Sequence, residues 1–501
     1  MLNTSLGSRI VVIRQYRIFI KALSPLNKKV HSSMLCQNED EFAESMEKKK
    51  KVTFVMLGPP QHGKSSVLGA LSYQSMSTLA QQESDIRFKQ ATFSEAPKQE
   101  YAWMMDQFQE EKQDGTHIPA FAIIEKGNLI LQFVDAPGGN TTKNEQMRHR
   151  AISMGEFGIV VLSAAPTDGV ENFFMEDLWH EQMTFIREAV LLGIKSFIFV
   201  INKLDEAKWN FAKFIELQKA IKTSMKHHFY DQQKTELHFI PASGKLGINI
   251  YEKLVKPPKK LQWLNQGKLT LLEACMKLGE QKAHGSLSPL RMPVFDVYRT
   301  LKDREIIVIG KILQGEIYTK MKILLSHSNE AFLVSSVKHI CQIGEGKDYK
   351  DYELICASPD SIVAVNLGRL PLNFKIAIGD MISNPKIDAA RLIESFRAKF
   401  TTLQDQYLLC EKEYQLIANT TQVRILVKQI FNSDSFEQIQ PEINPVSTAY
   451  IKVEVLEPLH LVSSYVSSLI SSFVLRDESG EMIGSGHVRD SNKVKKQESN
   501  K

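Results

Sequence analysis

The chain is poor in cysteine and has no long apolar run. Its five cysteines are scattered among 501 residues without a CxxC pair (Cys36, Cys275, Cys341, Cys356 and Cys410). This spacing predicts neither a disulfide framework nor a zinc site, and it fits a reducing compartment. No apolar run approaches the roughly 18 residues that a membrane-spanning helix needs. The sequence therefore predicts a soluble protein.

The N-terminal segment lacks acidic residues. The first 38 residues contain no Asp or Glu, while lysines and arginines are spaced among Ile, Val, Phe and Ser. This composition is typical of a mitochondrial transit peptide. A disordered arm and an over-extended reading frame are the alternatives, and Met46 would be a natural start. We expect a cytoplasmic protein, with a mitochondrial location as the alternative.

The overall charge is only mildly basic. Sixty-two Lys and Arg stand against 57 Asp and Glu, which gives a formal net charge of +5. This excess permits RNA or another polyanion as a partner without arguing for one. At roughly 100 to 200 residues per domain, the length predicts about three domains.

Short apolar runs alternate with stretches of helical periodicity in the first half of the chain. The runs do not alternate polar with apolar residues, which is typical of strands in a parallel sheet covered by helices on both faces. Ligands bind such sheets at the carboxyl ends of the strands. The five runs are Val52–Leu57, Leu129–Val134, Ile159–Leu162, Phe197–Ile201 and Leu237–Ile240.

The residue pattern changes after about Pro289, where helical periodicity is largely lost. Strand-length runs with glycine turns follow, as in "IIVIGKILQGEIYTKMKILL", and they predict one or two antiparallel β domains. A short helix is predicted between Pro385 and Phe400. The last residues, "KVKKQESNK", are interpreted as a solvated tail.

The stretch "GPPQHGKSS" directly follows the first run and satisfies the phosphate-binding loop pattern. Backbone N–H groups from about Gln61 onward would cradle phosphates, since Pro59 and Pro60 donate none. Lys64 would reach the phosphate oxygens and Ser65 would bind Mg²⁺. The predicted phosphate-binding residues are Gly58, Gln61, His62, Gly63, Lys64, Ser65 and Ser66.

Two further residues of this predicted site follow the second run, in "DAPGG". Asp135, at the end of the strand, would hold the same Mg²⁺ as Ser65, usually through water. Gly138 gives the backbone the freedom to turn its N–H toward a γ-phosphate. Alone, "DAPG" would be no more than a strand-ending turn.

The loops after the fourth and fifth runs predict a guanine site. In "NKLD", Asp205 would accept hydrogen bonds from two guanine donors that adenine lacks, Asn202 would bridge to a neighbouring loop, and the Lys203 stem would stack on the base. In "ASGK", the residues placed to close over the guanine O6 are Ser243, Gly244 and Lys245.

These motifs resemble those of the translational GTPases, in the branch of elongation factor 1-alpha, the eukaryotic release-factor GTPase and the ribosome-rescue GTPase. "YAWMMDQFQEEKQDG" is similar to the lead into switch I, and "SSFVLRDESGEMIGSGHV" is similar to the last strands of the third domain. The resemblance spans about Lys51 to Val488. It implies a fold of an α/β GTP-binding domain with a parallel sheet and phosphate-binding loop, followed by two antiparallel β-barrel domains.

The resemblance also implies domain boundaries, ligands and partners. The expected ligands are GTP or GDP and Mg²⁺, and the expected partners are the ribosome, a tRNA or tRNA-mimicking protein, and a nucleotide-exchange factor. The expected parts are a basic extension (1–50), a GTP-binding domain (51–284), a first barrel (285–386), a second barrel (387–490) and a charged tail (491–501).

Two positions depart from the family pattern. The switch I threonine position holds His117, with Thr116 one place early, in Gly115-Thr116-His117-Ile118. The histidine that follows Asp-Ala-Pro-Gly in the family is Gly139 here, or Asn140 if the loop is one residue longer. His149 is too distant in sequence to be assumed a substitute. Because that histidine orients the attacking water, we expect GTP binding with slow or partner-dependent hydrolysis.

Three functions remain open from the sequence. The first is a GTPase of the elongation, release or rescue type, and "NKLDEAKWN", around Trp209, slightly favours release or rescue. The second is a GTP-bound regulator or adaptor without turnover, which Gly139 and His117 favour. The third, the GTPase subunit of a sulfate-activating enzyme, is disfavoured by "YAWMMDQ" and "FVLRD".

Overall fold

The computed structural model describes most of the chain in two compact units. One unit contains residues 50–282, 343–344 and 392–493, and the other contains residues 289–339 and 353–391. The described residues are 49–76, 78, 81, 101, 120–139, 141–165, 185–228, 236–282, 289–299, 305–327, 331–339, 343–344, 353–354, 356–370, 374–432, 439–463 and 470–493.

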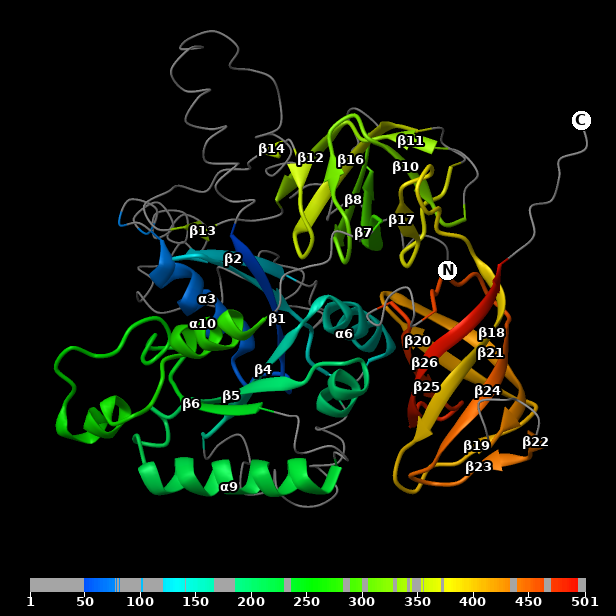
Figure 1. Cartoon of the computed structure of the whole chain (residues 1–501). Helices are drawn as coiled ribbons and strands as arrows, with labels where there is room; N and C mark the ends of the chain where they lie inside the picture. The colour runs from blue at the N-terminus through cyan, green and yellow to red at the C-terminus, as the bar shows by residue number, and fades with distance from the viewer. Residues whose placement is uncertain are drawn as a thin grey trace, which may run out of the picture. The chain divides into compact units, whose positions relative to one another are not determined.

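A seven-stranded sheet forms the centre of the first unit (Figure 1). Its strand order is β13-β2-β3-β1-β4-β5-β6, and the five strands from β3 to β6 run parallel. β2 runs antiparallel to β3 and was not predicted. The strands are β1 (Lys50–Leu57), β2 (Ala120–Lys126), β3 (Leu129–Asp135), β4 (Phe157–Ser163), β5 (Ser196–Asn202), β6 (Glu236–Pro241) and β13 (Ile343–Gly344).

All five predicted strands are present in this sheet. β1, β3, β5 and β6 each end directly before a loop that carries one of the predicted motifs or continues it, so those loops share the carboxyl edge of the parallel sheet. The helical elements described with them are α3 (Lys64–Ser75), α6 (Thr142–Met154), α9 (Phe211–His228), η4 (Lys259–Asn265) and α10 (Leu271–Gln281).

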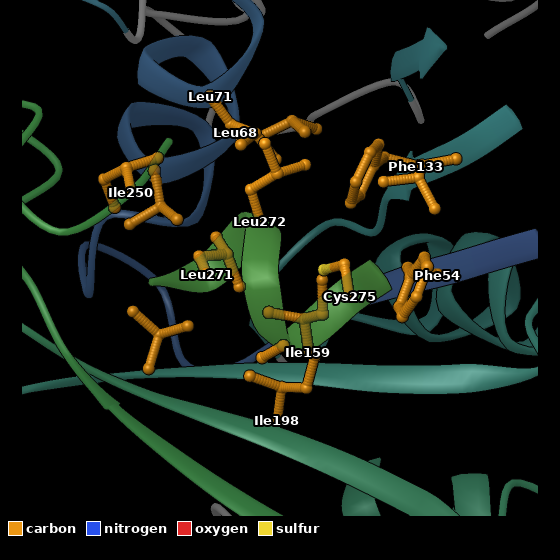
Figure 2. Packing of buried hydrophobic residues seen from close by; sticks show 14 of the residues in the cluster. Phe54, Leu68, Leu71, Phe133, Ile159, Ile198, Ile250, Leu271, Leu272 and Cys275 are labelled. Carbon is orange, nitrogen blue, oxygen red and sulfur yellow. The ribbon is translucent and has the colours of Figure 1, made fainter. Parts of the chain in front are cut away.

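The main core of this sheet lies where α3 and α10 pack on one of its faces (Figure 2). Leu271, Leu272 and Cys275 of α10 belong to this core together with Ile159 of β4 and Ile198 of β5, and Leu272 lies beside Leu68 of α3. α10 begins with a capping box, because the Thr270 and Glu273 side chains each bond the other's backbone N–H. Burial raises the pKa of the Cys275 thiol well above its ordinary value, so this cysteine is a core residue and not a reactive one.

The second unit is an antiparallel β structure around its own core. Its larger sheet has the order β11-β10-β17-β7-β8-β16-β12-β14, and β9 pairs with β15. Its strands are β7 (Arg291–Arg299), β8 (Glu305–Lys311), β9 (Ile317–Tyr318), β10 (Lys322–Leu325), β11 (Ala331–Leu333), β12 (Ser336–His339), β14 (Glu353–Leu354), β15 (Cys356–Ala357), β16 (Ile362–Arg369) and β17 (Met381–Ser383).

A closed barrel forms the C-terminal part of the first unit. The order β20-β25-β26-β18-β24-β21 closes because β20 also pairs with β21. The strands are β18 (Ile393–Thr402), β19 (Leu408–Leu409), β20 (Lys412–Ala418), β21 (Thr421–Phe431), β22 (Ile439–Gln440), β23 (Glu442–Ile443), β24 (Thr448–Val455), β25 (Ser472–Arg476) and β26 (Met482–Lys493).

The predicted helix between Pro385 and Phe400 is wrong. β18 covers the second half of that segment, and its even-numbered positions from Phe396 to Thr402 are buried while the odd-numbered ones are mostly exposed. This period of two is that of a strand with one face on a core. The residues directly before β18 are a mixture of small, charged and apolar ones. Read together with β18, they resemble the residue pattern of a helix.

The predicted fold class is confirmed: a parallel α/β domain is followed by antiparallel β domains. The N-terminal extension (1–48) and the last residues (494–501) lie outside the described residues. Within the described part of the chain, no helix is long and apolar enough to cross a membrane.

Phe54 provides a test of the main core. Its ring is fully buried and lies 5.5 Å from Phe133 and 5.4 Å from Phe157, measured between ring centroids. Phe54→Ala should lower the free energy of unfolding of this domain by about 3 to 5 kcal/mol. Urea denaturation measures the loss. Val255→Ala is the control, since Val255 is 93% exposed and its change should stay within about 0.5 kcal/mol. Equal losses in the two variants would contradict the described packing.

Candidate functional site

The loop between β1 and α3 has the backbone of a tight, glycine-dependent turn. Gly58, Gln61 and Gly63 all have positive φ, at 139°, 63° and 90°. A Cβ on Gly63 would lie 2.4 Å from the side-chain amide nitrogen of Asn202, and one on Gly58 would lie 2.4 Å from the Val161 carbonyl oxygen. Both glycines are therefore required by close approach as well as by conformation.

Lys64 lies inside this loop. Its ammonium group donates to the carbonyl oxygens of Gly58 and Pro59, both at 2.9 Å. Burial lowers the pKa of Lys64 to about 8, and the nearby Asp135 carboxylate opposes this shift. A buried cation that is held only by neutral carbonyls and one acid is suited to receive an anion.

The first residue after Lys64 meets the end of β3. The Ser65 hydroxyl donates to an Asp135 carboxylate oxygen at 2.9 Å, so the predicted metal pair is adjacent in space. Gly138 approaches the same loop: a Cβ there would lie 2.8 Å from the Lys64 ammonium and 2.9 Å from the Pro60 nitrogen. No larger residue fits at position 138 without moving the loop.

Asn202 connects three loops through one buried amide. Its side-chain nitrogen donates to the His62 carbonyl at 2.9 Å, and its side-chain oxygen accepts from the Gly244 N–H at 2.8 Å. His62 is fixed further because its Nδ1 accepts from the Ser163 N–H at 3.0 Å. The sequence predicted that Asn202 bridges to a neighbouring loop, and the structure shows that contact.

Asp205 lies on the loop after β5, beside Lys203. One of its carboxylate oxygens is buried and accepts no hydrogen bond from any described residue. A buried carboxylate oxygen without a donor is costly, so this position fits a ligand that brings N–H groups. The loop after β6 lies next to this loop, since the Leu204 N–H donates to the Ala242 carbonyl. In it, Ser243 is buried, Lys245 is exposed, and the Gly244 N–H donates to Asn202.

Helix α6 holds the loop that follows β3. The Thr141 side chain caps the helix by accepting from the Asn144 N–H. The Asn144 side chain donates to the Gly138 carbonyl and the Arg148 guanidinium donates to the Gly139 carbonyl, each at 2.9 Å. Our sequence analysis missed Asn144 and Arg148; the capping pattern "TTKN" was the available signal.

Arg148 also belongs to a buried charge cluster around Glu188, which is 0% exposed. Glu188 lies 3.8 Å from the Arg148 Nε, 3.5 Å from a guanidinium nitrogen of Arg476 in β25, and in contact with His149. Arg476 also lies 3.6 Å from Glu145 of α6. His149 is thus buried against Glu188 within α6 and is not part of the loop after β3, where the sequence analysis expects the family histidine.

Several predicted positions lie outside the described residues. These are the switch I residues Gly115, Thr116, His117 and Ile118, and the alternative histidine position Asn140. All residues predicted for the phosphate, guanine and metal contacts are described. The structure brings them to one edge of the parallel sheet, in the loops that Asn202 and the Ser65–Asp135 bond connect.

The geometry defines a phosphate-loop nucleotide-binding domain, and comparison with known proteins gives its family. Residues 49–281 match the model of the elongation factor Tu GTP binding domain. This part of the chain therefore carries a divergent GTP-binding domain of the translational GTPase family. The chain is 28% identical to elongation factor 1-alpha of Sordaria macrospora over 308 residues, which is 60% of this chain and 65% of that protein.

The chain is also 28% identical to elongation factor 1-alpha of Pyrococcus furiosus over 270 residues, covering 54% of this chain and 57% of that one. The matches thus span roughly three-fifths of these relatives. Among solved structures, the fold is similar to the GTP-bound Ski7 GTPase-like domain of S. cerevisiae, with a TM-score of 0.67, 18% identity, and coverage of 90% of this chain and 98% of that one.

The buried lysine predicts a pH dependence. In the protein without nucleotide, folded Lys64 loses its proton at about pH 8, whereas the unfolded lysine does so near its ordinary pKa of 10.5. Between these values the unfolded state binds more protons, so the free energy of unfolding should rise with pH. Lys64→Met should remove roughly 2 to 3 kcal/mol of this rise, measured by urea denaturation across pH 8 to 10.5. Lys245→Met, at an exposed site, should leave it unchanged; the same slope in Lys64→Met would contradict the assignment.

Proposed function

We propose that the chain binds GTP and GDP with Mg²⁺ at this edge of the sheet. The main support for this proposal is the buried carboxylate oxygen of Asp205, which accepts no hydrogen bond from any described residue. Guanine offers two adjacent N–H donors there, and adenine does not, so the site selects guanine by leaving polar groups unpaired with the wrong base. Lys203 lies on the same loop, and its stem would stack on the ring.

The phosphate side of the site is built from the loop before α3. The buried Lys64 ammonium, whose pKa burial lowers to about 8, would regain a full charge beside phosphate oxygens. Ser65 and Asp135, 2.9 Å apart, would hold Mg²⁺, which is bound in such sites by one or two protein groups together with phosphates. Backbone N–H groups from Gln61 to Ser66, with Gly138, complete the proposed contacts. The GTP in the Ski7 structure supports this proposal.

Replacing Asp205 tests the guanine contact. Asp205→Asn should weaken GTP binding by roughly 10²-fold or more, because an amide cannot accept two hydrogen bonds from the N1 and N2 donors. Xanthosine triphosphate, which carries a carbonyl at C2, should bind the variant better than GTP. Competition against a fluorescent GTP analogue measures both affinities. Glu206→Gln, an exposed neighbour on the same loop, should bind GTP like the wild type. Unchanged GTP affinity in Asp205→Asn would contradict the proposed site.

The proposed role is that of a translation-factor-like GTPase of the elongation, release or rescue type. The protein would act in the cytoplasm with the ribosome and with a tRNA or a tRNA-mimicking protein, and would use a nucleotide-exchange factor. Support comes from the elongation factor 1-alpha relatives and from the fold shared with translation elongation factor SelB of Methanococcus maripaludis, at a TM-score of 0.60 and 14% identity.

Slow or partner-dependent hydrolysis is part of this proposal. Gly139 stands where the family carries the water-orienting histidine, and its φ of 88° is a conformation that disfavours any side chain. Its carbonyl is held by Arg148. Without a group to orient water, hydrolysis should proceed near intrinsic rates of roughly 10⁻⁴ s⁻¹.

A GTP-bound regulator or adaptor without turnover is the second candidate. The observation that favours it is the way α6 fixes the loop: Asn144 and Arg148 bond the two carbonyls of Gly138 and Gly139. This arrangement holds the loop in place without any catalytic side chain. Single-turnover hydrolysis of labelled GTP with and without ribosomes separates the two candidates.

Gly139→His tests whether the missing histidine limits hydrolysis. A Cβ at position 139 would lie 3.5 Å from the Asn144 side-chain nitrogen and 3.8 Å from a Pro60 carbon, so space is available. On ribosomes, Gly139→His should hydrolyse GTP at least roughly tenfold faster than wild type in single turnover. Gly139→Ala carries the same backbone cost without the imidazole and should not accelerate. Fast hydrolysis by the wild-type protein would contradict the proposal.

A further inference from the structure

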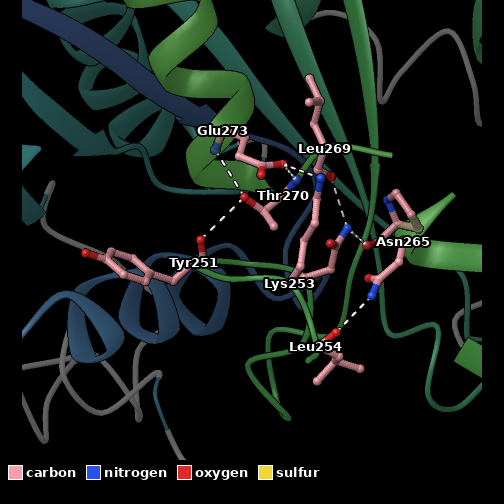
Figure 3. Close-up of polar contacts among 9 residues, drawn as sticks. Tyr251, Lys253, Leu254, Asn265, Leu269, Thr270 and Glu273 are labelled. Atoms are coloured by element: carbon pink, nitrogen blue, oxygen red, sulfur yellow. Dashed lines mark hydrogen bonds and ion pairs between the residues drawn. The ribbon is translucent and has the colours of Figure 1, made fainter. Parts of the chain in front are cut away.

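Residues 252–268 form an excursion between the loop after β6 and α10, here called the lysine excursion. Its ends are tied together: Asn249 donates to the Pro241 and Leu269 carbonyls at 2.8 and 3.2 Å. The Thr270 hydroxyl donates to the Tyr251 carbonyl at 3.4 Å, and within the excursion Asn265 donates to the Leu254 carbonyl at 2.8 Å (Figure 3). The excursion therefore has a fixed path over the domain.

Its inner side is anchored by apolar packing. Leu261 and Leu264 of η4 are 8% and 2% exposed. The Trp263 ring lies 5.1 Å from the ring of Phe211 and 5.6 Å from that of Phe214. The apolar side chains and the indole are thus engaged with the domain itself.

Its outer side carries positive charge that is not neutralised. The excursion contains five lysines, one glutamate and no arginine. Lys253 lies 3.3 Å from Glu273, but no described carboxylate pairs with the exposed Lys256, Lys259 or Lys260. The two prolines between Lys256 and Lys259 fix φ and stiffen the backbone there.

This surface offers charge without apolar anchors, which favours a phosphate backbone over a protein partner. Its lysines bind phosphate oxygens as point charges, without the fixed two-bond geometry that arginine gives. A protein interface also needs apolar anchors, and here Leu261 and Leu264 point inward, leaving Val255 as the exposed one. Base stacking is disfavoured because Trp263 already packs against two rings.

We propose that Lys256, Lys259 and Lys260 form a sequence-independent contact with the phosphate backbone of RNA. The choice of RNA as the polyanion rests on the proposed translation function. The surface itself rests on the charge and anchoring described above. It lies outside the proposed nucleotide contacts, so GTP binding and RNA binding are separable by measurement.

The test compares RNA binding by the full chain and by two triple variants. Fluorescence anisotropy with a labelled single-stranded RNA of mixed sequence gives Kd over a salt series. Lys256→Ala, Lys259→Ala and Lys260→Ala together should weaken binding by roughly tenfold or more at about 0.1 M salt. They should also lower the slope of log K against log salt by about 2. The matched control replaces three exposed lysines elsewhere, Lys219, Lys399 and Lys452, by Ala.

The control triple removes the same charge and should change the Kd by less than about twofold. A Lys-to-Arg triple at 256, 259 and 260 should keep RNA binding, and every variant should bind GTP like the wild type. Equal weakening by the two alanine triples would overturn the proposal, and so would unchanged RNA binding in the triple variant at 256, 259 and 260. Polyglutamate that competes as strongly as unlabelled RNA would also overturn it. Loss of GTP binding in wild type and variants alike would count against the proposed function and not against this surface.

Discussion

The buried amide of Asn202 is the interaction on which the candidate site depends. One nitrogen and one oxygen, both inside the protein, bond the loop before α3 and the loop after β6. Each of those loops is irregular, so a partner outside the loop helps to hold it in one conformation. Because a single side chain serves both, the proposed phosphate and guanine contacts are positioned relative to each other by the end of one strand, β5.

The loop after β3 is fixed by different means. Its carbonyls at Gly138 and Gly139 accept from Asn144 and Arg148, so α6 determines its path. Burial lowers the pKa of Arg148 to about 10, yet the group stays charged at neutral pH and keeps its hydrogen bond. Order in this loop therefore does not require a histidine at position 139.

The sequence predicted the parallel sheet well because its strands are continuous apolar runs, and the motif loops follow those runs directly. It failed where the local pattern was ambiguous. The segment before Phe400 mixes small, charged and apolar residues, and pairing with β24 and β26 decides that it is a strand. The antiparallel strand β2 was missed, since it is defined by its pairing with β3 in the folded chain. Arg148 and Glu188 are far apart in sequence, and only folding places them together. The roles of the site residues remain predictions.

The charge cluster around Glu188 has a consequence for modularity. Its members come from α6, from the helical residues 185–191 and from β25 of the closed barrel, all within one compact unit. A carboxylate buried this deeply is tolerated only while its cations remain, and removing one partner of such a group typically costs several kcal/mol. The GTP-binding part and the C-terminal barrel are therefore not interchangeable modules. A chimera that exchanges the barrel must carry an arginine at the place of Arg476, and a substitution at any of these positions constrains the others during divergence.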